Sequence, residues 1–131
     1  MTDFALDTNT LSYFLRGQGR VAHRLLATSP QQVALPAIVV FEIRYGMRKA
    51  ARTSQLTAFE SMLESCVVLG FDGEAADHAA DIRLALESAG TPIGPHDVLI
   101  AATARRHRRT LVTRNTREFA RVAGLALDDW Y

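Results

Sequence analysis

The sequence predicts an α/β fold in which a central, mainly parallel sheet of four to five strands lies between two layers of helices. Short β-branched runs alternate along the chain with helical segments. Such alternation requires crossover connections between parallel strands, and it covers both faces of the sheet with helices. The length of 131 residues gives room for one buried core, so we expect residues 1–131 to form a single domain.

The composition is that of a folded protein outside the membrane. Hydrophobic residues make up 48% of the chain and charged residues 22%, a balance that argues against disorder. The longest apolar stretches are too short to cross a bilayer, and the N-terminus has no basic region followed by an apolar segment. The single Cys66 cannot form an internal disulfide. We therefore expect a cytoplasmic protein without a membrane span.

The first part of the chain contains two predicted strands and three predicted helices. The run Phe4–Leu6 is short and apolar and stops at a polar turn, as a buried strand does. Leu11, Phe14 and Leu15 then recur at helical spacing until Gly17 ends the first helix. The predicted elements are a strand over Phe4–Leu6, a helix that follows Asp7, a helix that carries Val21, Leu25 and Leu26, a strand over residues 33–35 and a helix that opens at Pro36.

The second part continues the same alternation. Gly90 lies just beyond one predicted helix, and Pro95 suits the first turn of the next. A β-branched run at residues 110–113 predicts a strand, after which Asn115 can open a short helix. The predicted elements are helices over Thr53–Leu63 and residues 74–88, a helix that opens at Pro95, a short helix over residues 115–119, strands over Val67–Leu69 and residues 110–113, and an edge strand over residues 125–127.

Charge is distributed unevenly along the chain although the net charge is only +1. Seven acidic residues and one arginine lie between Glu60 and Glu87, whereas seven arginines and one acidic residue lie between Arg105 and Arg121. The second segment would attract a polyanion. Lys49 is the only lysine. Arginine suits bidentate contact with phosphate or carboxylate, although a GC-rich genome also favours arginine codons.

Candidate site residues gather where the predicted strands end. In an open parallel sheet, sites form outside the carboxyl ends of the strands. Carboxylates held together there repel one another unless a cation or shared protons neutralise them. Oxygen ligands without a His or Cys set favour a hard ion such as Mg²⁺ or Mn²⁺. The residues that this rule selects are Asp7, Glu42, Asp97, Thr113, Arg114 and Asn115.

Most of these residues also have a purely structural interpretation. Asp7 can cap the helix that follows it, and Asp97 can serve as a favourable negative charge in a first helical turn. Asn115 can cap a helix, with Glu118 at a spacing close to that of a capping box. Glu42 interrupts the apolar run IVVFEI, where an unpaired buried carboxylate would be costly. The structural interpretation is therefore weakest for Glu42.

The chain carries four short motifs in a fixed order. They are FALDTNT at the N-terminus, FEIRYG around Glu42, GPHDVLIAATAR around Asp97 and LVTRNTREF near the C-terminus. Together they resemble the PIN-domain ribonucleases, and in particular the VapC-type toxins of bacterial toxin–antitoxin pairs. The resemblance spans nearly the whole chain and implies a PIN-like three-layer α/β/α fold.

The resemblance also implies an endoribonuclease in which Asp7, Glu42 and Asp97 bind Mg²⁺ or Mn²⁺. A hard divalent ion held by these ligand types would activate a water and offset negative charge on the phosphodiester. Water, rather than an enzyme side chain, would be the nucleophile. Cleavage in this family leaves a 5′-phosphate and a 3′-hydroxyl.

One position departs from the family pattern. The family often has a further acidic residue after the last strand, where this chain has Asn115 with Glu118 close behind. Asn115 can orient a metal-bound water, or Glu118 can contribute a carboxylate, and the sequence leaves both open. Thr8 and Thr113 match hydroxyl positions near the family's site and would help to position the ligands.

The resemblance implies partners as well. Arg114 and Arg117 are placed to hold RNA phosphates. A basic track would extend from them, formed by Arg105, Arg106, Arg108 and Arg109. The alternative interpretation of these arginines is a solvated helix face. The family pairs with a small VapB-type antitoxin whose C-terminal segment occupies the acidic groove. Its members usually form homodimers, for which the helix with Ile38, Phe41 and Tyr45 is a candidate face. Known substrates include structured RNAs, transfer RNA among them.

Two other functions fit parts of the sequence. Asp7-Thr8-Asn9-Thr10 is similar to the DxDxT motif of aspartate-nucleophile phosphatases, but the second acid is an amide and Lys49 is the only candidate for the later lysine. A catalytically silent PIN-like module that binds RNA or protein is the second alternative, since Asn115 replaces a carboxylate. The three remaining carboxylates argue against such a module.

Overall fold

The computed structural model describes residues 2–131 and contains a five-stranded sheet in which every strand pairing is parallel. The strand order is β3-β2-β1-β4-β5, with the N-terminal strand in the centre. This arrangement confirms the predicted α/β class with a parallel sheet. The strands are β1 (Phe4–Leu6), β2 (Val33–Pro36), β3 (Val67–Leu69), β4 (Thr110–Val112) and β5 (Leu127–Asp128).

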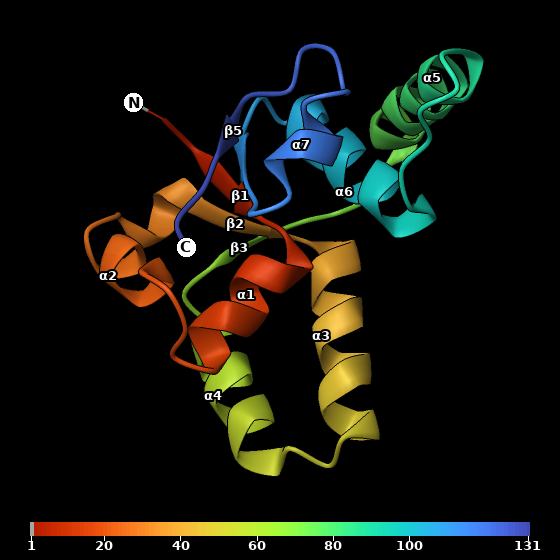
Figure 1. Ribbon diagram of the computed structural model, residues 1–131. Coiled ribbons are helices and arrows are strands. Elements are labelled where there is room, and N and C mark those ends of the chain that lie inside the picture. Colours follow the sequence, from red (N-terminus) through yellow and green to blue (C-terminus); the bar gives the residue numbers. More distant parts are fainter. Residues whose placement is uncertain (1) are drawn as a thin grey trace.

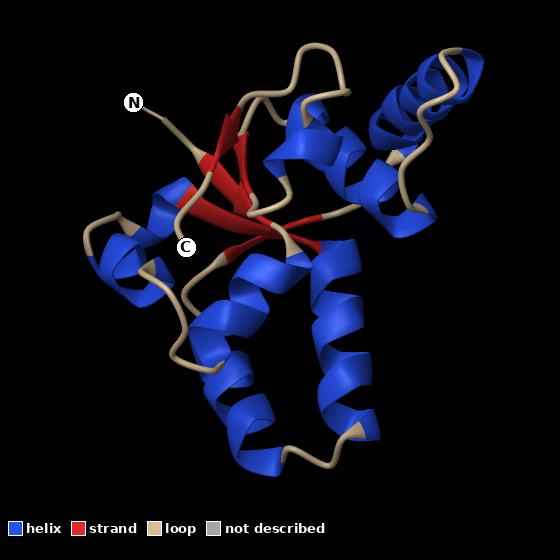
Figure 2. Ribbon diagram, viewed as in Figure 1, coloured by secondary structure: helices blue, strands red, loops and turns tan. Residues whose placement is uncertain are grey.

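Helices cover both faces of the sheet. They are α1 (Thr8–Leu15), α2 (Val21–Leu26), α3 (Ala37–Lys49), α4 (Thr53–Leu63), α5 (Gly73–Ser88), α6 (Pro95–Arg106) and α7 (Thr116–Phe119), with a single 3₁₀ turn at Pro30–Gln32. Helices α1, α3 and α4 lie on one side of the sheet and α5, α6 and α7 on the other (Figures 1 and 2). Right-handed crossovers explain the division, because the chain moves outward from β1 to β3 and then returns to the other side of β1 for β4 and β5.

The core is built around the central strand. Phe4 pairs with Val33 on one side and with Thr110 on the other. Ala5 and Leu6 are fully buried. The outer strand β3 is more open, with Val67 38% exposed. Within residues 2–131, no helix has both the length and the hydrophobicity that crossing a bilayer requires.

Several element boundaries differ from those predicted, and β4 ends at Val112 rather than at residue 113. Pro36 ends β2 and forms the N-cap of α3 instead of lying in its first turn, because its ψ of 141° is extended. Helix α5 begins at Gly73, where the Asp72 side chain accepts a hydrogen bond from the Ala75 amide at 2.8 Å. The last strand covers Leu127–Asp128 rather than residues 125–127, and its register on β4 fixes that position.

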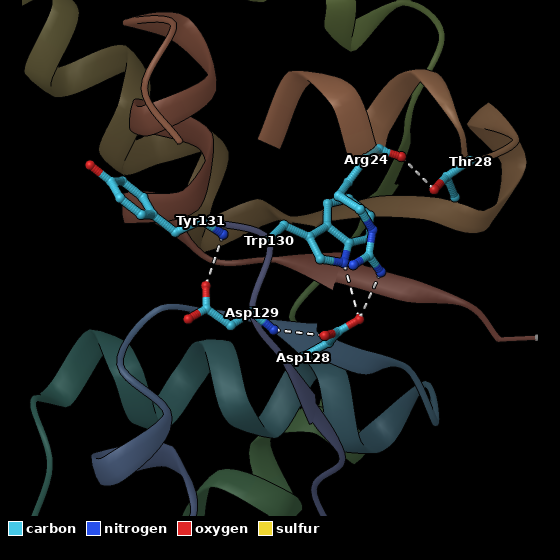
Figure 3. A network of polar contacts seen from close by, with 6 residues as sticks. All are labelled: Arg24, Thr28, Asp128, Asp129, Trp130 and Tyr131. Atoms are coloured by element: carbon cyan, nitrogen blue, oxygen red, sulfur yellow. Dashed lines mark hydrogen bonds and ion pairs between the residues drawn. The ribbon is translucent and has the colours of Figure 1, made fainter. Parts of the chain in front are cut away.

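The C-terminal segment is fastened to the rest of the molecule by Trp130. This side chain is 1% exposed, and its ring packs edge-on against Phe4 at 4.9 Å between centroids. Trp130 Nε1 donates to Asp128 Oδ2 at 3.1 Å, and Arg24 Nη2 donates to the same oxygen at 3.2 Å. Figure 3 shows Arg24 of α2 and Trp130 meeting at this carboxylate. The end of the chain is thereby joined to β1 and α2.

Tyr131 extends this attachment towards α1. Its ring packs edge-on against Tyr13 at 4.8 Å, and its carbonyl accepts a hydrogen bond from the Arg20 amide at 3.0 Å. Gly19 has a φ of +67°, and a Cβ there would lie 2.8 Å from Tyr131 Cδ2. Glycine is therefore needed at this position both for its backbone conformation and for the close approach of the tyrosine.

Candidate active site

A crevice site is expected between β1 and β4 at the carboxyl end of the sheet. These strands are neighbours, and the helices that follow them, α1 and α7, lie on opposite sides of the sheet (Figure 1). Ligands bind at such switch points in open parallel sheets. Asp7 follows β1 and Thr113 follows β4, and the Asp7 amide donates to the Val112 carbonyl at 3.1 Å. Both residues therefore lie at this edge.

Asp7 has a structural role at the start of α1. It is 4% exposed, and its Oδ1 accepts a hydrogen bond from the Thr10 amide at 2.8 Å, so the predicted helix cap is confirmed. Burial raises the pKa of Asp7 above its ordinary value, while hydrogen bonds from Thr113 and Thr10 act in the opposite direction. An ionised carboxylate has about four lone-pair sites, so capping leaves Asp7 able to bind a cation as well.

Glu42 lies in the second turn of α3 and has a partner for each carboxylate oxygen. Thr8 Oγ1 donates to Oε1 at 2.6 Å, and His96 Nδ1 lies 3.2 Å from Oε2. The side chain is 27% exposed. Glu42 is thus neither fully buried nor unpaired, which differs from the environment that its apolar neighbours in the sequence indicate. Contacts from α1 and α6 hold its carboxylate in place.

Asp97 lies in the first turn of α6, as predicted, and is half-buried. Burial is the main cause that raises its pKa, and the negative charges of Asp7, Glu42 and Glu118 raise it further. Charges influence one another in this way only over short distances, so Asp7, Glu42 and Glu118 lie in the neighbourhood of Asp97, and we call these four residues the carboxylate cluster. Gly94 leaves room for the carboxylate, because a Cβ at that position would lie 3.3 Å from Asp97 Oδ2.

Asn115 and Glu118 interact with each other after β4. Asn115 Nδ2 donates to Glu118 Oε2 at 2.9 Å, and the Asn115 amide donates to Thr113 Oγ1 at 3.0 Å. Asn115 is the N-cap residue of α7 by position, but its side chain makes no capping hydrogen bond to the helix backbone. Thr113 is fully buried. The side-chain amide of Asn115 therefore orients the Glu118 carboxylate, whose negative charge raises the pKa of Asp97.

Two further residues belong to this neighbourhood. His96 contacts Glu42 and stacks edge-on against Phe41 at 5.8 Å. In the sequence, only its position directly before Asp97 indicates it. The charge of Asp129 makes a small contribution to the raised pKa of Asp7. Sequence reasoning missed Asp129, because an acidic residue near the C-terminus has no spacing that links it to the end of β1.

The carboxylate oxygens suit a hard divalent ion as ligands, although their side chains do not form a compact group of ligands. Among residues 2–131, no three His, Cys, Asp or Glu side chains lie close enough to hold one ion together. All the converging groups are carboxylates, which Mg²⁺ and Mn²⁺ prefer. The chemistry of the residues therefore fits such an ion.

The arginines of the predicted basic track differ in their availability. Arg114 and Arg117 are exposed. The Arg114 guanidinium lies 3.7 Å from the centroid of the Tyr131 ring. Arg105 is engaged internally, since its nitrogens donate to His78 Nδ1, the His78 carbonyl and the Ala123 carbonyl. It also lies about 12 Å along α6 from Asp97, given a rise of about 1.5 Å per residue.

The remaining members of the track are only partly free. Arg106 lies at ion-pair distance from Asp72 and Glu74, and Arg109 donates to two backbone carbonyls at the opposite end of the sheet. Arg108 is exposed. The structure therefore offers separate basic side chains near the carboxylates rather than a continuous free track along α6.

Comparison with known proteins identifies the family to which this chain is similar. The family model described as PIN domain matches residues 4–125. The "tRNA(fMet)-specific endonuclease VapC" of Salmonella typhimurium is 33% identical over 131 residues, which cover 99% of each chain. "Ribonuclease VapC2" of Rickettsia felis is 33% identical, with 97% of each chain covered.

Solved structures agree with the sequence comparisons. The toxin–antitoxin complex described as DNA-bound VapBC from Salmonella typhimurium contains a chain that superposes with a TM-score of 0.91 at 33% identity, covering 100% of both chains. A chain of the FitAcB complex from Neisseria gonorrhoeae gives a TM-score of 0.83 at 34% identity, with 95% of each chain covered. In both comparisons the similarity extends over nearly the whole chain.

Proposed function

Because the chain belongs to the PIN-domain family, and within it to the VapC ribonucleases, we propose that it is a metal-dependent endoribonuclease that acts as the toxin of a toxin–antitoxin pair. Relatives that carry ribonuclease names cover nearly the whole chain at 33% identity. The observation that carries the proposal is the convergence of Asp7, Glu42, Asp97 and Glu118 at one end of the sheet. Mutually repelling carboxylates reduce stability, and a cation relieves that cost.

We assign Asp7, Glu42 and Asp97 as the ligands of Mg²⁺ or Mn²⁺. When bound, such an ion supplies a water of lowered pKa and neutralises negative charge that develops on the phosphodiester. The three side chains come from the end of β1, the second turn of α3 and the first turn of α6, so they belong to three different elements instead of lining one helix. We expect cleavage to leave a 5′-phosphate and a 3′-hydroxyl.

The neighbouring polar residues position these ligands. Thr8 holds Glu42 through the 2.6 Å hydrogen bond, and Thr113 supports Asp7. Of the two candidates left open after β4, we assign the acidic function to Glu118 and an orienting function to Asn115, because the amide bonds the Glu118 carboxylate. Such supporting contacts commonly change metal affinity or activity by about 10- to 100-fold when they are lost.

The substrate is RNA, and transfer RNA is the class we propose first, because the relative from Salmonella typhimurium carries that specificity in its name. Arg114 and Arg117 are exposed beside the crevice and suit contact with phosphates. The internally bonded Arg105 is better placed to join α6 to α5 and the loop after α7 than to reach RNA.

A small VapB-type antitoxin is the proposed partner. The structural relatives are toxin–antitoxin complexes from Salmonella typhimurium and Rickettsia felis. We propose that a cationic side chain of the antitoxin enters the carboxylate cluster, and that two copies of this chain associate through α3. Phe41 is 53% exposed there and Tyr45 57%, and the two rings stack at 6.4 Å, with Ile38 on the same helix.

The proposal is tested with the purified protein and total cellular RNA. The RNA is incubated with Mg²⁺, with Mn²⁺ or with a chelator, and the new 5′-phosphate ends are sequenced. We expect discrete ends with either metal and none with the chelator. Asp97→Asn should abolish the ends while leaving the fold intact, as judged by circular dichroism. Equal cleavage by the Asp97→Asn variant at matched salt would contradict the site assignment.

The alternative is a PIN-like module that binds RNA or protein without cutting. This alternative is supported by Asn115, which stands where the family often has an acidic residue. Glu118 weakens that support, because its carboxylate accepts a hydrogen bond from the Asn115 side chain. The module predicts RNA or antitoxin binding with no new 5′-phosphate ends under any metal condition. The aspartate-nucleophile phosphatase has less support, because the Lys49 ammonium lies over the Tyr45 ring near the far end of α3.

A further inference from the structure

A groove runs from the carboxylate cluster along α1 and α3 to the start of α4. It has a volume of about 280 Å³ and begins at Thr8 and Glu42. Residues four apart on each of two helices form its walls, so one face of α1 lies opposite one face of α3. We call this feature the α1/α3 groove, and its other lining residues used below are Ser12, Arg16, Gly46, Ala50, Arg52 and Gln55.

The α1/α3 groove is positively charged away from the carboxylates. Arg16 and Arg52 line it, both are exposed, and neither forms an ion pair anywhere in residues 2–131. Glu42 is the only acidic residue of the lining, and it lies at the end nearest the proposed metal ligands. The charge therefore changes from negative to positive along the length of the groove.

The groove leaves free space beside α3. A Cβ at Gly46 would meet nothing within 4 Å, so this face of α3 leaves free space. Gln55 Oε1 is buried and has no hydrogen-bond partner among the described residues. Because this oxygen is buried, it is not open to a ligand in the groove. From Glu42 to Ala50 the groove extends about 12 Å along the helix direction.

We propose that the α1/α3 groove binds the backbone of a single RNA strand next to the cleaved bond. The inference rests on the proposed ribonuclease function and extends it by assigning the path of the substrate. Arg16 and Arg52 would contact the phosphates of that strand. In the sequence, both arginines lie far from the arginine-rich segment between Arg105 and Arg121.

Aromatic contacts link this groove to Arg114. The Arg16 guanidinium lies 5.9 Å from the Tyr13 ring centroid, and Arg114 lies 5.8 Å from the same centroid. Arg114 also lies over Tyr131. Arginine planes and aromatic rings that alternate in this way offer stacking surfaces for unpaired bases between phosphate contacts. A strand could therefore pass from Tyr131 and Arg114 over Tyr13 to the groove.

A binding experiment tests this path without interference from cleavage. In an Asp97→Asn background, the affinity for a fluorescent, unstructured oligouridine is measured over a series of salt concentrations. Replacing both Arg16 and Arg52 by Ala should weaken binding about tenfold at low salt. It should also reduce the slope of log K against log salt by about 1.4, since each phosphate contact on a single strand contributes about 0.7.

Gly46 provides a matched set of controls. Gly46→Glu should weaken RNA binding more than Gly46→Gln, because the two side chains have similar size and differ in charge. Gly70→Glu adds the same charge beyond the edge strand β3, at a glycine whose Cβ would also meet nothing within 4 Å, and should leave binding unchanged. Circular dichroism checks that each variant is folded.

The outcomes separate this inference from the proposed function. Suppose that the parent protein cleaves RNA, but that neither the double Ala variant of Arg16 and Arg52 nor Gly46→Glu changes the affinity or its salt slope. The proposed path of the RNA through the groove is then wrong, and the ribonuclease function stands. If the parent cleaves nothing, the proposed function fails, and the oligouridine measurement still decides whether the groove binds RNA. If the variants bind RNA normally but lose the antitoxin, the groove is a protein-binding surface and the inference is overturned.

Discussion

At the scale of single residues, folding places carboxylates where their charged forms are disfavoured. Asp97 is surrounded by Asp7, Glu42 and Glu118, and burial and these charges together raise its pKa. Asp7 is more deeply buried and has a raised pKa as well. The capping hydrogen bond from the Thr10 amide offsets part of the free-energy cost of burying Asp7, because α1 needs an acceptor at its N-terminus. The arrangement reduces stability at neutral pH, which is typical of functional sites.

The raised pKa of Asp97 predicts how stability depends on pH. The unfolded chain releases this proton near the ordinary value of 3.8, whereas the folded chain holds it to higher pH. The contribution of the carboxyl to stability is therefore complete below pH 3.8 and is lost as the pH rises through the folded-state pKa. Without divalent ions, Asp97→Asn should raise the melting temperature at neutral pH, and the gain should shrink on acidification. A gain that is independent of pH would contradict the linkage.

Gly94 allows the position of the Asp97 carboxylate to be tested. In Gly94→Ala the new Cβ would lie 3.3 Å from Asp97 Oδ2, so the carboxylate must move by a few tenths of an ångström. We expect a several-fold fall in the cleavage rate with little change in melting temperature, because catalytic groups tolerate small displacements poorly. Gly70→Ala, where a Cβ meets nothing within 4 Å, is the matched control. Equal rates for the two variants would exclude this role of Gly94.

At the scale of elements, each proposed ligand is delivered by a different helix or strand. The sequence alone predicts these elements well, because short apolar runs, glycines and prolines mark their ends. It places Asp7 after a strand and Asp97 in a first helical turn, and both placements are confirmed. The sequence cannot predict the contact of Thr8 and His96 with Glu42, since α1 and α6 meet α3 only through tertiary packing.

The hydrogen bond between α1 and α3 can be removed without changing the shape of the side chain. Thr8→Val keeps the branched side chain but no longer donates to Glu42 Oε1. We expect the affinity for Mn²⁺, measured by calorimetry on the folded variant, to fall by about 10- to 100-fold. Thr8→Ser should restore most of it, because the hydroxyl is retained. If Thr8→Val binds Mn²⁺ as the parent does, the threonine is not a positioning residue.

At the scale of the whole molecule, the parallel sheet and its division of helices follow from the strand order, and the sequence predicts that class. The arrangement of charge over the surface is harder to predict. The run of arginines from 105 to 109 reads as one basic track, yet folding directs Arg105, Arg106 and Arg109 to internal partners. Arg16 and Arg52 are isolated in the sequence and become neighbours of one groove only in three dimensions.

Trp130 fastens the C-terminal segment to the centre of the molecule, so its removal should affect global stability. Trp130→Ala should cost about 3–5 kcal/mol of unfolding free energy, because a fully buried ring is lost. Trp130→Phe should cost less, since it loses mainly the hydrogen bond to Asp128. Urea unfolding followed by circular dichroism measures both. Leu26→Ala, at a side chain that is 91% exposed, is the control and should change little.

The central place of β1 has a consequence for the timing of biosynthesis. Phe4 pairs with Thr110, so the first strand to leave the ribosome finds one of its two neighbours only when most of the polypeptide has been made. Asp7, Asp97 and Glu118 cannot meet before that moment, because the crevice between β1 and β4 does not yet exist. The carboxylate cluster is therefore among the last features of the fold that synthesis can complete.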